Sequence, residues 1–270
     1  MPLANSNGTK VFWNEAESGD PLVMIMGLGH SHELWYRTWP VMTRKYRTIV
    51  YDNRGTGQSD VPPGPYSVAQ MAADTAAVMD AAGLERAHVL GISMGGMIAQ
   101  EFAIAYPHRV QSLVLGCTTC GGQNSVPAAP NVREAFTALA TMTPEERAEA
   151  TVPLLFDASM LRARIDESLA VLGRARATDA GYASQGEGIR AWTGCYDRLP
   201  QIKAPTLIVH GETDQLIPPQ NAYILHERIA GSRLVMLPHA GHMLPDAFQE
   251  AVLEFLATSG PRPARSEAAT

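Results

Sequence analysis

The chain has few cysteines and no long run of basic or of apolar residues. Its three cysteines, Cys117, Cys120 and Cys195, are an odd number and too few for a disulfide framework in 270 residues, so we expect a reducing compartment. Cys117 and Cys120 have the spacing of a redox or zinc motif, but no second pair of Cys or His residues stands at ligand spacing. We therefore expect structural thiols and no metal site.

The missing charge and hydropathy patterns exclude further classes of partner. The 27 acidic residues outnumber the 21 basic ones, and the formal net charge is −6, so no nucleic-acid partner is expected. Residues 1–10 lack the basic and apolar regions of a signal peptide, and every apolar run is shorter than about 18 residues. The sequence therefore predicts no membrane partner and a cytoplasmic location, and it does not predict an oligomeric state.

The composition, 46% hydrophobic and 18% charged, is that of a globular protein with a large core. Short apolar runs alternate with amphipathic stretches, as strands and helices do around a parallel sheet. The continuous Val, Ile and Leu character of these runs suits strands that are covered on both faces. The predicted strands are residues 21–27, 46–53, 87–93, 110–117, 205–211 and 233–238.

A long segment without a strand signal interrupts this alternation after residue 122. Leu161, Ile165, Leu169 and Leu172 recur in it at helical spacing, which predicts one apolar helix face. We expect a helical cap, with extra helices packed on the core as the alternative. The predicted division is a core over residues 1–122 and 197–258, a helical cap over 123–196 and a flexible tail over 259–270.

The strongest local motif is Gly91-Ile92-Ser93-Met94-Gly95, a G-x-S-x-G that follows an apolar run and precedes a helical one. In this context the serine occupies a sharp turn between strand and helix, and the small glycines allow the two elements to approach closely. Ser93 is therefore predicted to be a nucleophile, with Met94 N–H at a helix N-terminus facing an oxyanion. A plain glycine-rich turn is the alternative.

A serine nucleophile needs a general base that an acid orients, and both are expected downstream of Ser93. Asp214 follows a predicted strand and is the candidate acid, with Glu212 as its close rival and a turn-capping role as the alternative. His242 follows the last predicted strand and is the candidate base, whereas His239 stands three residues too early. We expect surface or packing roles for the other histidines, which are His30, His32, His88, His108, His210 and His226.

These motifs, together with Gly27-Leu28-Gly29 and the run of residues 52–59, carry a resemblance to a family. The chain resembles the α/β-hydrolase superfamily over nearly all of its length, and within it the esterase, enol-lactonase and haloperoxidase-like branch. The resemblance implies the α/β-hydrolase fold, a mostly parallel sheet flanked by helices with a helical cap insertion. It also implies that Leu28 N–H joins Met94 N–H in the oxyanion hole. The usual histidine before the first glycine loop is Met26 here.

The resulting prediction is a serine hydrolase that cleaves small-molecule carboxylic esters or lactones, with acyl-homoserine lactones as one candidate substrate and no cofactor. Epoxide hydrolases and haloalkane dehalogenases of similar outline use an Asp nucleophile, so Ser93 argues against both. Carbon–carbon hydrolases, amidases, perhydrolases and a low-turnover small-ligand receptor remain open.

Aromatic residues near the expected cap edge are candidates for the substrate pocket, with ordinary packing as the alternative. They are Trp35, Trp39, Trp192 and Tyr196. Asp52 and Arg54 are expected to brace the turn over residues 52–59 and not to act in catalysis.

Overall fold

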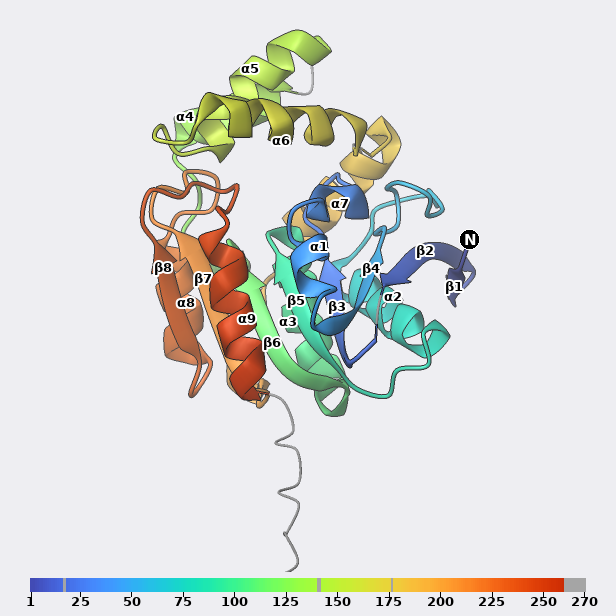
Figure 1. The fold of residues 1–270 in the computed structure, drawn as a ribbon. Helices are drawn as coiled ribbons and strands as arrows, with labels where there is room; N and C mark the ends of the chain where they lie inside the picture. Colours follow the sequence, from blue (N-terminus) through green and yellow to red (C-terminus); the bar gives the residue numbers. More distant parts are fainter. Residues whose placement is uncertain (17, 140–141, 176, 260–270) are drawn as a thin grey trace, which may run out of the picture.

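The structure, a computed structural model, describes residues 1–16, 18–139, 142–175 and 177–259. Within these residues an eight-stranded sheet has the order β1-β2-β4-β3-β5-β6-β7-β8 (Figure 1). The β1–β2 and β2–β4 pairs are antiparallel, and the remaining pairs are parallel. The strands are β1 (Leu3–Ser6), β2 (Thr9–Ala16), β3 (Asp20–Ile25), β4 (Tyr46–Tyr51), β5 (Ala87–Ile92), β6 (Val110–Gly116), β7 (Thr206–Gly211) and β8 (Arg233–Leu237). The predicted fold class is confirmed.

Helices cover both faces of the sheet. One face carries α2 (Val68–Ala81), α3 (Met94–Ala105) and α8 (Gln220–Arg228), and the other carries α1 (Trp39–Met42) and α9 (Ala247–Ser259). Side chains alternate along each strand, so Val23 and Ile25 join the core under α2 and α3, whereas Leu22 and Met24 join the core under α9. This double coverage explains the continuous apolar runs of the parallel strands.

All six predicted strands are present as β3 to β8, but β1 and β2 were not predicted. Their residues mix polar and apolar side chains, because β1 lies at the edge of the sheet and β2 beside it. Asn7 and Gly8 join them in a two-residue turn with φ of 49° and 87°. This Asn-Gly pair is a hairpin signal that the sequence contains.

The segment between β6 and β7 forms helices above the carboxyl edge of the sheet (Figure 1). They are α4 (Pro130–Ala138), α5 (Pro144–Leu155), α6 (Arg162–Arg174) and α7 (Asp179–Ala191), with short 3-10 turns at Gly122–Asn124 and Tyr196–Gln201. Ile165, Leu169 and Leu172 share one buried cluster, as their spacing predicts. Leu161 instead precedes α6 and is 78% exposed.

Helix α7 packs directly on the core through small residues. A Cβ on Gly181 would lie 2.0 Å from Gly55 O, and one on Gly188 would lie 1.7 Å from Tyr66 O. The two glycines are one heptad apart and therefore share a face of the helix. Because no side chain separates the backbones there, α7 is held close against the core loops.

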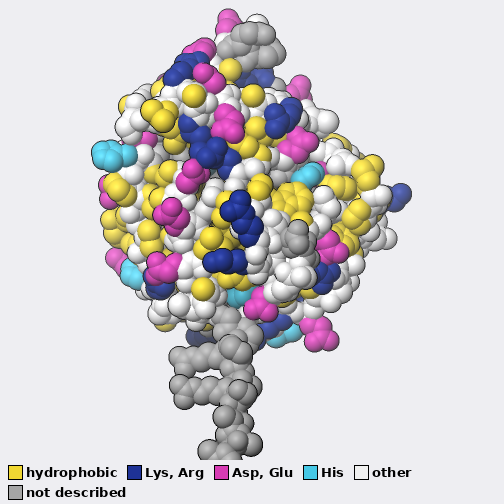
Figure 2. All heavy atoms as spheres, viewed as in Figure 1, with side chains coloured by type: hydrophobic (Ala, Val, Ile, Leu, Met, Phe, Trp, Pro, Cys, Tyr) yellow, Lys and Arg dark blue, Asp and Glu magenta, His cyan; other side chains and the backbone are white. Residues whose placement is uncertain are grey.

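The cysteines, the helices and the chain end relate to further expectations from the sequence. The three cysteines are buried free thiols. Among the described residues, no helix is both long and apolar enough to span a membrane. On the face shown in Figure 2, basic and acidic side chains are interspersed. The predicted tail lies outside the described residues except for Ser259, the last residue of α9.

Candidate active site

Ser93 occupies the sharp turn between β5 and α3, with φ 53° and ψ −123°. This backbone region is rarely adopted by residues other than glycine and costs of order 1–3 kcal/mol. Neighbouring elements hold it in place, since Ser93 N–H donates to Gly116 O at 2.9 Å and Thr118 Oγ1 donates to Ser93 O at 2.7 Å. The turn is therefore fixed from β6 and from the loop that follows it.

Glycines make this turn possible. A Cβ on Gly91 would lie 2.2 Å from Gly95 O, and a Cβ on Gly95 would lie 2.1 Å from Ile25 O. Both contacts are with backbone atoms, which cannot rotate away. The G-x-S-x-G spacing thus reflects the close approach of β5, α3 and the end of β3.

Asp214 and His242 meet on the loops after β7 and β8. His242 Nδ1 lies 2.8 Å from Asp214 Oδ2, and Asp214 Oδ1 accepts from the N–H groups of Leu216 and Ile217 at 2.9 Å each. A carboxylate only accepts, so Nδ1 carries the proton and Nε2 keeps a lone pair. His242 is thereby oriented as a proton acceptor.

The rival residues lie elsewhere. Glu212 and His239 are both exposed, whereas Asp214 is 3% exposed. Ser93 and His242 follow the parallel strands β5 and β8, so both stand at the carboxyl edge of the sheet. Among the described residues no hydrogen bond joins Ser93 to His242. Hydrogen bonds of this kind are often long until substrate binds.

Opposing effects set the pKa of Asp214. Burial acts to raise it, but the charge of His242 and hydrogen bonds from His210 and His242 outweigh burial and hold the pKa well below its usual range. The carboxylate is therefore ionised throughout the range in which proteins function.

His210 was not predicted as a site residue, yet it lies beside Asp214. It is fully buried in β7, with Nε2 2.8 Å from Ile217 O and 3.3 Å from Asp214 Oδ2. Its position four residues before Asp214 is the only signal in the sequence, and that spacing alone does not reveal the contact.

The loop after β3, which carries the predicted oxyanion donor Leu28, passes close to Ser93, and the second predicted donor, Met94, follows Ser93 directly. A Cβ on Gly27 would lie 3.2 Å from Ser93 Cβ and 3.6 Å from its Oγ. Within the described residues, neither Leu28 N–H nor Met94 N–H donates a hydrogen bond. Two backbone donors are thus available near the serine, as an oxyanion hole requires. Met26 O accepts from Asn53 Nδ2 at 2.9 Å, which anchors this loop without the usual histidine.

A cavity of about 270 Å³ lies between residues 28–30 and the helices above them. Its wall is mostly apolar, and Arg147 at its edge is bound to backbone carbonyls, with Nε 2.7 Å from Leu139 O and Nη2 2.8 Å from Met142 O. The apolar lining residues are Leu28, Phe136, Leu139, Ala148, Leu155, Leu169 and Leu172. An apolar group beside the loop that carries Leu28 fits this space best.

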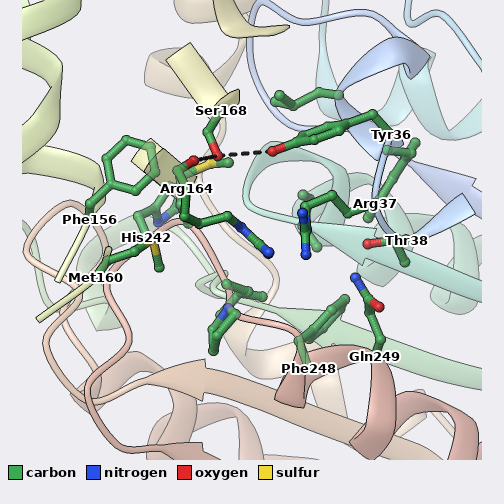
Figure 3. Close-up of a pocket in the computed structure, with 16 residues that line it drawn as sticks. Tyr36, Arg37, Thr38, Phe156, Met160, Arg164, Ser168, His242, Phe248 and Gln249 are labelled. Atoms are coloured by element: carbon green, nitrogen blue, oxygen red, sulfur yellow. Dashed lines mark hydrogen bonds between the residues drawn. The ribbon is translucent and has the colours of Figure 1, made fainter. Parts of the chain in front are cut away.

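A second cavity, about 70 Å³, is lined by His242 (Figure 3). Tyr36 Oη and Ser168 Oγ lie 3.0 Å apart at its wall, and the guanidinium groups of Arg37 and Arg164 face each other across it. Both arginines bind Asp246, with N–O distances of 2.9 Å and 2.8 Å. We refer to Arg37, Arg164, Glu167 and Asp246 as the Asp246 cluster, because Arg37 also pairs with Glu167 at 2.9 Å.

The predicted aromatic residues have different surroundings. Trp35 lines the smaller cavity. Trp192 Nε1 donates to Glu101 at 2.8 Å, and Trp39 packs against His32. The Cζ atom of Arg228 lies over the Tyr196 ring, 4.5 Å from its centroid. None of these last three lines either cavity.

The turn over residues 52–59 is braced as expected. Arg54 donates to Asp74 with Nε at 2.7 Å and Nη2 at 2.6 Å, and Asp52 accepts from the N–H groups of His32 and Gln58. In the described part of the chain, no group of three His, Cys, Asp or Glu side chains is arranged to hold a metal ion.

Known proteins match both the sequence and the fold. Residues 20–246 match the family described as alpha/beta hydrolase fold. The protein named "Putative carbamate hydrolase RutD" from Azorhizobium caulinodans is 30% identical over 266 residues, covering 94% of this chain and 98% of that protein. The enol-lactonase from Burkholderia xenovorans LB400 is similar at TM-score 0.82 and 27% identity, covering 95% of this chain and 100% of that chain. A structure described as Est816, an N-acyl homoserine lactone degrading enzyme, is similar at TM-score 0.79 and 27% identity, covering 94% of this chain and 100% of that chain.

Proposed function

The chain belongs to the α/β-hydrolase family and is a hydrolase, and on this premise we propose that it cleaves carboxylic esters or lactones through Ser93, His242 and Asp214. The observation that carries the proposal is the 2.8 Å hydrogen bond between His242 Nδ1 and Asp214. That bond leaves Nε2 of His242 able to take a proton, and Ser93 stands in a strained turn at the same carboxyl edge of the sheet.

The proposed reaction has two steps. Ser93 Oγ forms a bond to the substrate carbonyl carbon while its proton passes to His242 Nε2, and the N–H groups of Leu28 and Met94 stabilise the oxyanion. The carbon–oxygen bond to the alcohol then breaks, and His242 returns the proton to that oxygen. Water attacks the acyl-Ser93 ester in the same way, releases the acid and regenerates the serine. With a lactone the alcohol stays attached, so the product is a hydroxy acid.

The apolar cavity supports an acyl chain as the recognised part of the substrate. It lies against Leu28, the proposed oxyanion donor, so a carbonyl bound there directs its chain toward the cavity. A mostly apolar cavity of about 270 Å³ suits a medium-length acyl chain better than a small polar group. Acyl lactones, acyl-homoserine lactones included, are thus one candidate class, in line with the names of the two similar structures.

Carbamate hydrolysis is a second candidate because the 30% identical relative is named for it. The same serine chemistry would act on a carbamate carbonyl. The mostly apolar cavity favours acyl esters over a small polar carbamate.

A substrate panel with a matched variant tests the proposal. We expect purified protein to hydrolyse hexanoyl to decanoyl esters or lactones, and Ser93→Ala to lose activity by several orders of magnitude, because the three residues act as a unit. Wild-type-like turnover by Ser93→Ala overturns the serine mechanism. If the protein hydrolyses only carbamates and Ser93→Ala abolishes that activity, the serine mechanism stands and the substrate class is carbamates.

A further inference from the structure

We propose that His210 is a positioning residue that holds the turn carrying Asp214 and so sets how Asp214 binds His242. This inference rests on the proposed function, because it concerns the acid of the same three residues. His210 does not touch substrate in this account, and it acts through Asp214.

The tautomer of His210 follows from its partners. Its Nε2 lies 2.8 Å from Ile217 O, and a carbonyl oxygen can only accept, so Nε2 carries the proton. Nδ1 of His210 is buried and has no partner among the described residues. A proton on Nδ1 would be an unpaired buried donor, so the ring is the neutral Nε2–H tautomer.

His210 closes a ring of contacts around Asp214. It donates to Ile217 O, and the N–H of the same Ile217 donates to Asp214 Oδ1 at 2.9 Å. Nε2 of His210 also lies 3.3 Å from Asp214 Oδ2, the oxygen that binds His242. A single buried imidazole therefore restrains the turn over residues 214–217 and places a second polar hydrogen beside the oxygen that orients the base.

The other titratable groups around Asp214 are few. His242 binds it from the loop after β8, and His210 faces it from β7. Cys117, at the end of β6, is buried, and burial together with the charge of Asp214 raises the pKa of its thiol well above the usual value. The thiol therefore stays neutral, so the two histidines and the N–H groups of Leu216 and Ile217 are the polar groups on Asp214 that the structure describes.

Loss of the His210 donor has two expected consequences. The turn loses its anchor to β7, so Asp214 orients His242 less well and kcat falls. Asp214 Oδ2 also loses a stabilising dipole, so it attracts the His242 proton more strongly and favours the protonated base. Protonated His242 cannot take the Ser93 proton, so the acid limb of the activity profile moves to higher pH.

The experiment compares His210→Met, which keeps volume and removes the donor, with His210→Gln, whose amide can donate from a similar position. His88→Met is the control, because His88 is a fully buried histidine in β5 that hydrogen-bonds Ser112 and Gln111. We expect His210→Met to lower kcat about tenfold or more and to move the acid limb up by about half a pH unit or more. We expect His210→Gln to keep kcat and the acid limb of the pH profile close to wild type. We expect His88→Met to affect stability without moving the acid limb.

An unchanged limb and kcat in folded His210→Met overturn the proposal and leave His210 as core packing. If His210→Met does not fold, nitrogen NMR of the wild-type imidazoles decides, because an Nδ1–H tautomer of His210 contradicts the account and the Nε2–H tautomer supports it. Ser93→Ala separates the two claims. Activity that survives Ser93→Ala removes the proposed function itself, whereas activity lost there but indifferent to His210→Met removes only the positioning role.

Discussion

Gln185 Oε1 accepts a hydrogen bond from Gly29 N–H at 2.8 Å, which joins helix α7 to the loop that carries Leu28. The amide of the same fully buried side chain donates to Arg54 O at 2.8 Å. One glutamine thus connects the inserted helices to two core loops. The loop with the proposed oxyanion donor is therefore positioned partly from α7.

Replacing Gln185 should impair catalysis more than binding. In Gln185→Leu both Gly29 N–H and Arg54 O lose their partner, which costs about 1–3 kcal/mol for each buried group and releases the loop. We expect kcat to fall about tenfold or more with KM little changed, because oxyanion stabilisation acts in the transition state. Steady-state kinetics on a medium-chain ester measures both constants.

Gln185→Glu is the matched variant, because a carboxylate still accepts from Gly29 N–H and cannot donate to Arg54 O. It should retain more kcat than Gln185→Leu. A rise in KM at constant kcat in both variants would instead make Gln185 a residue that only shapes the cavity.

Replacing a glycine by alanine should have opposite effects on stability at two sites, the tightly packed turn at Ser93 and the open face of helix α7. Gly95→Ala places a Cβ 2.1 Å from Ile25 O and 2.8 Å from Met26 O, so we expect severe destabilisation. Gly186→Ala, in helix α7, meets only the end of Arg190 at 3.5 Å and should gain about 0.5–1 kcal/mol from helix propensity. Thermal and urea unfolding of both variants measure the difference. A Gly95→Ala protein as stable as wild type would contradict this packing.

The larger cavity predicts acyl-chain selectivity. Leu172→Trp fills part of the cavity wall, so kcat/KM should fall for decanoyl esters and be largely kept for butanoyl esters. Leu161→Trp serves as the control, because Leu161 is 78% exposed and does not line the cavity. Equal losses across the ester series in Leu172→Trp would show that the chain binds elsewhere.

The Asp246 cluster predicts a pH-dependent contribution to stability. Hydrogen bonds from Arg164 and Arg37 lower the pKa of Asp246 to about 2, below the value of about 3.9 expected in the unfolded chain. The contribution is therefore present above pH about 4 and is lost as the pH falls toward 2. Because the cluster is partly exposed, it also weakens with salt.

The stability difference between wild type and Asp246→Asn should accordingly shrink between pH 4 and pH 2. Urea unfolding at low salt, repeated across this range, measures it. A difference that stays constant with pH would mean that the carboxylate charge does not contribute.

The sequence predicts the parallel part of the fold well because each central strand is buried on both faces. Leu22, Val23 and Met24 form such a run, and their pattern needs no knowledge of distant residues. The β1–β2 hairpin is harder to predict because its strands are short and partly polar, although Asn7-Gly8 marks the turn.

Contacts between distant residues account for what the sequence does not predict. His210 appears as one more apolar-strand residue, and its bond to Ile217 O appears only when the loop after β7 folds back. Similarly, Trp192 binds Glu101 across 91 positions of the chain, a pairing that no local pattern reveals. Positions at the carboxyl edge of the sheet are predictable from chain order, whereas the side chains that support them are not.

Stopped-flow release of nitrophenol from a nitrophenyl hexanoate, with intact-protein mass measured at early times, tests most directly whether Ser93 forms an acyl-enzyme. We expect a burst of about one nitrophenol for each active chain, an acyl adduct on the wild-type protein, and neither in Ser93→Ala. Steady turnover in Ser93→Ala, or a wild-type adduct on a residue other than Ser93, would contradict the serine mechanism.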